Sequence, residues 1–471
     1  MSPKKHLGFS PLRDMLSRCF NKIVDTRQQS KIDYSLHDGM MSGFACMYFQ
    51  DPSLLQFQKR LEKKHHKSNL QTLFGIKNIP ESTQLRSMID GAKSDELSSF
   101  FDEYTHYLQR GKHLKQYQLL PGLYYIPMDA TDYFSSMACS CKKCLRTKPR
   151  KKAGAELSEG LENNEAEEQA YDTSESEKEV RYSHKAVQIA IMHPDIRQVI
   201  PLMPEEVYNT DGASKQDCEM NAAKRLIPKL RAAHPQLGII MGGDDLFSRQ
   251  PIITDILAAR MHYLFVAKPE SHVYMMEWLS AYPALNKLEF NEVNKKKQAV
   301  RHVVQWMNTV PLHGKKDTIN VNYLHYTMYT VNKNGKEIVG YQNSWVTDIE
   351  VTKENVQTLA RGGRCRWKIE NECFNTLKNQ GYCIDHSYGH GKENLAFNFY
   401  LLTLIAFSFH QIHELTDKLF QACRQHFGSK RHLWENLRAN LRTFIFPSWD
   451  YLLRFTLDPE HYISGELPAP T

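Results

Sequence analysis

The stretch Arg-Trp-Lys-Ile-Glu-Asn-Glu-Cys-Phe-Asn-Thr-Leu-Lys, residues 366–378, sets a carboxylate against an apolar surface. A helix with 100° between residues gathers four apolar side chains on one arc: Trp367, Cys373, Phe374 and Leu377. Glu370 falls inside this arc, Arg366 and Lys378 lie at its borders, and Lys368 and Glu372 point to the opposite side. A carboxylate on an apolar face is costly to bury unless it is paired or bound to a metal. Two interpretations are open: a buried ion pair with Arg366, and a metal-binding carboxylate.

The composition indicates a chain of more than one folding unit with a basic surface. At 471 residues, with 41% hydrophobic residues, it exceeds one typical core, so two or three domains are expected. The net charge is +7, and the strongly acidic segment 153–179 conceals how basic the remainder is. This charge favours a polyanionic partner such as nucleic acid.

The cysteine and apolar patterns argue against a secreted or membrane protein. The ten cysteines show no regular framework, and residues 1–30 contain no run resembling a signal peptide. The longest apolar run, 395–409, is shorter than the roughly 20 residues of a membrane span and contains polar residues. We therefore expect a cytoplasmic protein without a membrane segment, in which this run is a buried core helix.

Residues 1–115 have a mostly helical pattern, with turn signals at 51–53 and 79–82. The start of this region is basic, and residues 59–67 form a dense cluster of Lys, Arg and His. Solvated helix faces and a DNA-binding helical domain explain these charges equally well. We expect a helical N-terminal domain here.

Residues 116–300 contain the pattern of a mixed α/β sheet. Apolar runs predict five strands, at 123–129, 186–192, 198–203, 237–241 and 262–267. Helices are expected at 214–233 and 248–261, between the later strands. The first strand ends at Asp129 and the fourth is followed by Asp244 and Asp245, and strand ends are where such sheets carry their chemistry.

Three further segments complete the predicted organisation. The acidic segment 153–179 has almost no apolar content, so we expect a disordered insertion between the first two strands. Residues 301–356 are β-rich, and Asn334-Gly335 is a strong hairpin turn signal between 321–331 and 338–351. This region interrupts the α/β domain, because residues 357–471 carry the Glu370 helix and then helices to the end.

Asp129, Asp244 and Glu370 form a candidate catalytic set. Taken singly, each aspartate is more often a turn or cap residue. Together, three carboxylates on adjacent elements supply the oxygen ligands for two Mg²⁺ ions. Two such ions can activate an attacking oxygen and stabilise the leaving oxygen in a phosphoryl transfer.

Three motifs bear a family resemblance: Met128-Asp129-Ala130-Thr131, Gly243-Asp244-Asp245-Leu246-Phe247-Ser248 and Arg366-Trp367-Lys368-Ile369-Glu370-Asn371. With them the chain resembles the DDE-type transposases of bacterial insertion sequences, in particular the group with a Tyr-Arg-Glu-Lys signature. The resemblance covers about residues 120–450. It implies an α/β fold with an RNase H-like catalytic domain, interrupted by a β-rich insertion and preceded by a helical N-terminal domain.

The same resemblance implies the roles of individual residues and the activity. Asp129, Asp244 and Glu370 would be the catalytic, Mg²⁺-binding triad, and Arg366 and Lys378 would contact the DNA backbone. The protein would be a nucleoid-associated bacterial DNA transposase that nicks and joins strands at terminal inverted repeats and target DNA as a homodimer. An RNase H-like nuclease without strand transfer and an inactive, transposase-derived DNA-binding protein are the alternatives.

The chain departs from the group's pattern at three positions. Ala130 stands where the group has Gly, and Gly363 stands where the signature has Tyr. Lys378 follows Glu370 by eight positions, whereas the signature Lys follows by seven.

Two further constellations have candidate binding roles. Cys141 and Cys144 have the spacing of half a zinc site, with His184 as a possible third ligand; reduced cysteines at a sheet edge are the alternative. His390 and Lys392, in the Gly-rich stretch after the Glu370 helix, are candidate DNA contacts, with a simple inter-helix loop as the alternative. An aromatic of the β-rich region, Trp345 or Tyr341, could stack on a flipped base, although a core role is commoner.

Overall fold

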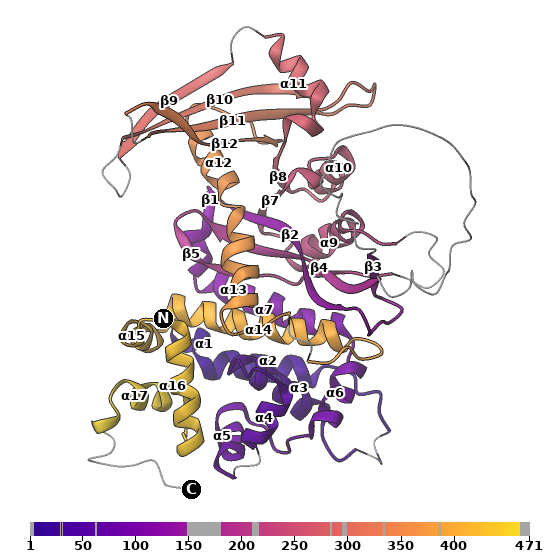
Figure 1. Cartoon of the computed structure of the whole chain (residues 1–471), viewed down its shortest axis with the longest axis vertical. Coiled ribbons are helices and arrows are strands. Elements are labelled where there is room, and N and C mark those ends of the chain that lie inside the picture. The colour runs from indigo at the N-terminus through magenta and orange to yellow at the C-terminus, as the bar shows by residue number, and fades with distance from the viewer. Residues whose placement is uncertain are drawn as a thin grey trace, which may run out of the picture.

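The computed structural model describes residues 4–28, 30, 32–61, 64–147, 180–209, 216–282, 285–293, 299–332, 335–385 and 388–461. It is a mixed α/β structure in three tiers, with the β-rich region at the top of Figure 1, the α/β sheet in the middle and the helices below. The predicted acidic insertion 153–179 lies outside the described residues.

The N-terminal region is helical. Its helices are α1 (Lys4–Leu7), α2 (Phe9–Asn21), α3 (Leu36–Tyr48), α4 (Leu54–Leu61), α5 (Lys64–Phe74), α6 (Ser82–Gly91) and α7 (Ser98–Arg110). The helix α3 begins where the Ser35 side chain accepts a hydrogen bond from the backbone N–H of Asp38, a standard N-cap.

The central sheet contains the strands that the apolar runs predict, but β2 continues to Ser136, so Asp129 lies within this strand and the prediction that the strand ends there is wrong. Its strands are β1 (Gln118–Leu120), β2 (Leu123–Ser136), β3 (Leu145–Thr147), β4 (Arg181–His193), β5 (Ile196–Pro201), β6 (Glu205–Val207), β7 (Gly238–Gly243) and β8 (His262–Val266). Two helices lie between the later strands, α9 (Glu219–Ala233) and α10 (Gln250–Ala258). The strand β2 pairs antiparallel with β4 and parallel with β7, and β7 pairs parallel with β8.

The β-rich region extends this sheet instead of forming a separate one. It consists of α11 (Val273–Ser280), β9 (Asn286–Val293), β10 (Ala299–Pro311), β11 (Asn320–Val331) and β12 (Glu337–Thr347). The strand β12 pairs antiparallel with β8, so the strand order runs β3-β4-β2-β7-β8-β12-β11-β10-β9. The pairing of β-strands in this region begins before residue 301, because β9 is paired along its length with β10.

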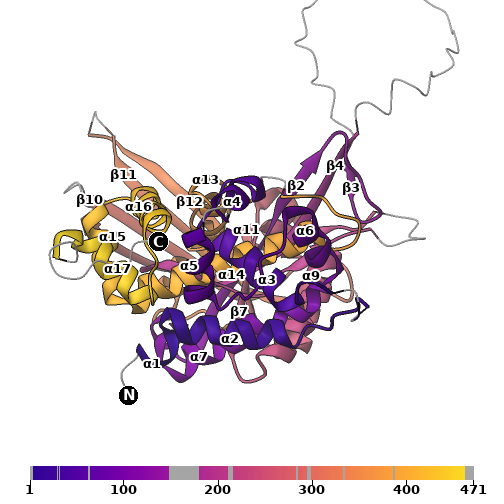
Figure 2. The same cartoon turned by 90° about the horizontal axis from the view of Figure 1, so that it is seen from below.

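The chain after β12 returns to the central sheet through α12 (Val356–Arg364), a π-helical turn (Ile369–Phe374) and α13 (Asn375–Asn379). It ends in α14 (Leu395–Thr416), α15 (Lys418–Phe427), α16 (Lys430–Thr443) and α17 (Trp449–Leu457). Figures 1 and 2 show α14 lying between the N-terminal helices and the sheet.

The helix α14 forms the centre of the hydrophobic core. Among the described residues it is the one helix long and apolar enough to cross a membrane, but 94% of its most apolar window is buried inside the protein. The interpretation of 395–409 as a core helix is confirmed. Buried residues from the N-terminal helices, the sheet and the C-terminal helices form one contiguous cluster around it.

Candidate active site and metal centre

Asp129 lies in β2, and Asp244 directly follows β7, the parallel neighbour of β2. The register pairs Pro127 of β2 with Gly242 of β7, and each aspartate follows its paired residue by two positions. Because side chains alternate along a strand, residues at equal register in a parallel pair point to the same face. Gly242 leaves room for the Tyr125 side chain of β2, since a Cβ there would lie 2.3 Å from the Tyr125 hydroxyl oxygen.

Glu370 is positioned by the π-helical turn. The backbone N–H of Asn375 donates to the carbonyl oxygen of Glu370, five residues earlier, so this turn holds one residue more than an α-helical turn. The Glu370 side chain is 52% exposed and pairs with Arg366, with 2.8 Å between Nη2 and Oε1. The ion pair expected from the sequence therefore forms, but at a half-exposed position.

The π turn also changes which side chains are buried. Lys368, expected on the polar side, is buried, and its Nζ donates to the carbonyl oxygens of His193, Pro194 and Ile196. Trp367, expected on the apolar arc, is 45% exposed. Both predictions are wrong because they assume a regular α-helix, with 100° between successive residues, from Arg366 to Lys378. The π turn and the hydrogen bonds of Lys368 exclude such a helix.

Arg366 joins two of the candidate carboxylates. Its Nη1 lies 3.1 Å from Oδ2 of Asp129, and its Nη2 contacts Glu370. Burial raises the pKa of Asp129 to about 6, opposed by Arg366 and reinforced by the charges of Asp244 and Glu370. Burial also raises the pKa of Asp244, although its carboxylate accepts a hydrogen bond from the backbone N–H of Leu246.

A second charged pair, Lys185 and Glu219, lies beside the aspartates. Lys185 of β4 donates from Nζ to Oε1 of Glu219 at the start of α9, at 2.7 Å. The Glu219 charge acts on Asp244, and the Lys185 ammonium lies in the field of Asp129 and Asp132. The pair lines an open cavity of about 670 Å³ between β4 and α9. Sequence patterns do not predict a role for Lys185, and they favour Glu219 only as an acidic residue at the start of a helix, because the proximity of this pair to the aspartates depends on strand pairing.

This donor set is chemically suited to a divalent cation. Carboxylate oxygens are the preferred ligands of Mg²⁺. The raised pKa values of Asp129 and Asp244 reflect burial of negative charge, which a cation would relieve. In the part of the chain that the structure describes, these carboxylates do not form a group whose donor atoms all lie within 4.8 Å. The three carboxylates therefore do not form a preassembled metal site in this structure.

The other residues with predicted DNA roles have mixed environments. Lys378 is partly exposed, 3.8 Å from Oδ1 of Asp385, and the Lys392 side chain is exposed. Trp345 is fully buried, and a Cβ on Gly363 would lie 2.5 Å from its indole ring, so it packs against α12 as a core residue. Tyr341 is partly buried, and the guanidinium of Arg364 lies 4.6 Å from its ring centroid.

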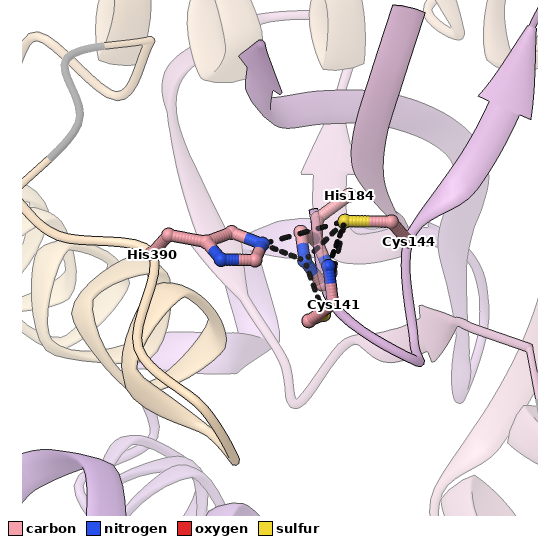
Figure 3. A group of neighbouring side chains, drawn as sticks. All are labelled: Cys141, Cys144, His184 and His390. Carbon is pink, nitrogen blue, oxygen red and sulfur yellow. Dashed lines mark hydrogen bonds between the residues drawn. The ribbon is translucent and has the colours of Figure 1, made fainter. Parts of the chain in front are cut away.

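A second site brings together two cysteines and two histidines (Figure 3). Cys141 and Cys144 lie on the turn before β3, His184 lies on β4, and His390 lies on the loop before α14. The thiol sulfurs of Cys141 and Cys144 are 3.7 Å apart, and the Nε2 atoms of His184 and His390 are 3.2 Å apart. The four donor atoms all lie within 4.8 Å of one another, and this cluster could hold a metal ion such as zinc.

Neighbouring groups orient the cluster. The backbone N–H of Cys141 donates to Sγ of Cys144, and Nδ1 of His184 lies 3.4 Å from Oε1 of Glu206. Burial lowers the pKa of His184, but hydrogen bonds with Cys141 and Glu206 outweigh burial and raise it to about 9. A hydrogen bond with Cys144 is the main reason that the pKa of the Cys141 thiol is far below its usual value.

The sequence identified three of these four residues. It expected Cys141, Cys144 and His184, but it assigned His390 to DNA contact, whereas the structure directs the His390 ring into the cluster. The only local signal at His390 is its position between Gly389 and Gly391, and both glycines have positive φ angles of +139° and +72°. His193, the other histidine near the cysteines in sequence, contacts Asp195 instead.

A scan against models of known protein families found no match, and a search of curated proteins found no significant similarity.

Proposed function

We propose that this chain is a metal-dependent DNA transposase of the DDE type, with an RNase H-like catalytic domain. The observation that carries the proposal is that Asp129 lies in β2 and Asp244 directly follows its parallel neighbour β7, with Glu370 joined to Asp129 through Arg366. The strand order β5-β4-β2-β7-β8, with the β-rich region between β8 and the Glu370 element, agrees with the fold that the family resemblance implies.

Two departures from the Tyr-Arg-Glu-Lys signature have a structural explanation that supports the proposal. Because a π turn contains one extra residue, the position eight residues after Glu370 occupies roughly the place of the seventh in a regular helix. Lys378 can therefore take the role of the signature Lys. Gly363, at the position of the signature Tyr, leaves the space that the buried ring of Trp345 fills.

In this proposal the three carboxylates would hold two Mg²⁺ ions, which would activate the attacking oxygen and stabilise the leaving oxygen. The attacking group is water in the nicking step and a DNA 3′-hydroxyl in the joining step. In each step one P–O bond forms, the opposite P–O bond breaks, and the leaving oxygen takes up a proton. Arg366 would hold a DNA phosphate beside the carboxylates, and the exposed ring of Trp367 is available for stacking on a base.

The test compares the two glutamates of the π turn. Glu370→Gln should abolish Mg²⁺-dependent cleavage of a duplex that carries the inverted repeats flanking the gene, and Asp129→Asn and Asp244→Asn should do the same. Glu372→Gln is the matched control, because Glu372 pairs with the exposed Arg197, 3.2 Å away, and such pairs contribute little. All four variants should bind the duplex nearly as tightly as the unchanged chain.

Three outcomes separate the proposal from its alternatives. Cleavage that survives in Glu370→Gln but is lost in Glu372→Gln would contradict the site assignment. Tight duplex binding without cleavage in Mg²⁺ or Mn²⁺ would indicate an inactive, transposase-derived DNA-binding protein. Cleavage without joining to a target plasmid would indicate a nuclease.

A further inference from the structure

We propose that Cys141, Cys144, His184 and His390 bind one zinc ion, and that this ion is a structural clamp between the sheet and the loop 388–394. The proposal is independent of the transposase activity, since it concerns a site with different residues and a different metal.

The donor distances match a tetrahedron around zinc. With Zn–S bonds of about 2.3 Å and Zn–N bonds of about 2.05 Å, tetrahedral geometry requires separations of about 3.8 Å for S–S, about 3.6 Å for S–N and about 3.3 Å for N–N. The structure has 3.7 Å between the two sulfurs and 3.2 Å between the two Nε2 atoms. Sulfur–nitrogen separations are 3.4 Å from Cys141 to His184, and 3.3 Å from Cys144 to both His184 and His390.

The kind of donor selects the metal and its role. Two thiolates and two imidazoles in a tetrahedron are typical of zinc, whereas Mg²⁺ requires oxygen ligands. Four protein ligands complete the coordination sphere, so the ion has no open position for substrate, as in structural zinc sites. Cys144 and His184 are buried, and Cys141 and His390 are half-buried, which limits access of water.

A carboxylate beside His184 gives this ligand the hydrogen-bonding arrangement that is common for histidines bound to zinc. Glu206 lies 3.4 Å from Nδ1 of His184 and accepts a hydrogen bond from the Tyr133 hydroxyl at 2.7 Å. A carboxylate on the far ring nitrogen of His184 directs its Nε2 toward the metal. The N–H···S bond from Cys141 to Cys144 shapes the turn that presents both sulfurs.

The position of the site explains why a clamp is useful there. The loop 388–394 leads directly into the core helix α14, and α13 and the Glu370 turn precede it in the chain. Of the four ligands, only His390 comes from this loop, while the other three belong to the turn before β3 and to β4. Zinc would therefore hold the loop against the sheet. It would join His184 to His390, which are 206 positions apart in the sequence.

The first test measures metal in the purified full chain after expression in zinc-replete medium. We expect close to one zinc per chain, and replacement by Co²⁺ should give the absorption of a tetrahedral site with two thiolates. Cys144→Ser and His390→Ala should lose most of the zinc and change the Co²⁺ spectrum. Cys139→Ser is the matched control, because Cys139 is exposed and lies two positions before Cys141.

Two outcomes would overturn the proposal, one measured on the wild-type chain and one on the His390→Ala variant. A metal-free wild-type chain that also takes up no added Zn²⁺ or Co²⁺ would exclude the site. If His390→Ala kept full zinc and an unchanged Co²⁺ spectrum, the four-ligand clamp would be wrong. Removal of zinc by a chelator should lower the melting temperature by several degrees, since zinc bound only to the folded state stabilises it.

Discussion

Asp129 illustrates, at the scale of a single residue, how a candidate catalytic group opposes stability. Its pKa is raised to about 6 from the ordinary 3.8, chiefly by burial, although the Arg366 guanidinium opposes the shift. The folded chain therefore holds a proton on Asp129 that the unfolded chain has lost between pH 4 and 6. Below pH 4 Asp129 is protonated in both states and does not lower the free energy of unfolding. As the pH rises through 6 the buried carboxyl must ionise, and this part of the free energy of unfolding is lost.

Asp129→Asn should consequently stabilise the protein at high pH. The neutral amide mimics the protonated acid, so we expect a gain on the order of 1–3 kcal/mol at pH 8 and almost none at pH 4. Melting temperatures in buffer without added divalent metal, measured at both pH values, would show it. Glu277→Gln, at an exposed carboxylate, should change neither value. A variant less stable than wild type at pH 8 would mean that the Arg366 ion pair outweighs burial.

Sequence reasoning finds residues whose chemistry is local and misses those whose role depends on distant partners. Asp129 and Asp244 could be selected because each ends an apolar run that predicts a strand. Lys368 could not be understood from its neighbours, because its three carbonyl partners belong to the turn between β4 and β5. His390 is the same case, as its metal-ligand partners lie more than 200 positions earlier.

At the scale of elements, apolar runs located the longer strands of the central sheet, but neither its short strands β1, β3 and β6 nor the whole β-rich region. The strand β9 was missed because its residues are mostly exposed and polar, so only pairing with β10 defines it. The π turn was missed because the sequence 366–378 has no breaker. Its geometry follows from tertiary anchoring of Lys368 and burial of Cys373 and Phe374.

The junction between α6 and α14 depends on one carboxylate. Asp90, near the end of α6, accepts hydrogen bonds from the backbone N–H groups of residues 392–395 at 2.9 to 3.0 Å. Burial raises the pKa of Asp90, but these backbone donors outweigh burial and lower it. The stabilisation is therefore present at neutral pH and is lost as the pH falls below the ordinary value toward the folded pKa.

Asp90→Ala should lower stability by about 1–3 kcal/mol at pH 7, because several N–H groups at the start of α14 lose their acceptor. The melting temperature would fall by several degrees. Glu393→Ala is the matched control, since the Glu393 side chain lies on the same loop and is exposed. Equal melting temperatures for the two variants would show that water replaces Asp90 without loss.

At the scale of the whole molecule, the N-terminal helices and the C-terminal helices share one aromatic core around α14. The ring of Phe409 lies 4.9 Å from that of Phe44 of α3, and Phe9 of α2 stacks on Trp449 of α17 at 5.0 Å. Nδ2 of Asn398 donates to the carbonyl oxygen of Ile89 at 2.7 Å. The sequence suggested a separate domain for residues 1–115, because helical patterning identifies helices but not which segment they pack against.

This sharing predicts that the N-terminal region does not fold alone. A fragment of residues 1–117 lacks α14, and so lacks the surface that buries Phe9 and Phe44, whereas an independent domain needs a core of its own. We expect the isolated fragment to show no cooperative thermal transition by circular dichroism.

Residues 118–471 alone should aggregate, because one side of α14 would be exposed. Co-expression of the two fragments is the control, since they should copurify as a complex with a cooperative transition if the shared core is the cause. A sharp transition in fragment 1–117 alone would instead show that helices α1 to α7 form a self-sufficient domain and that α14 only docks against it.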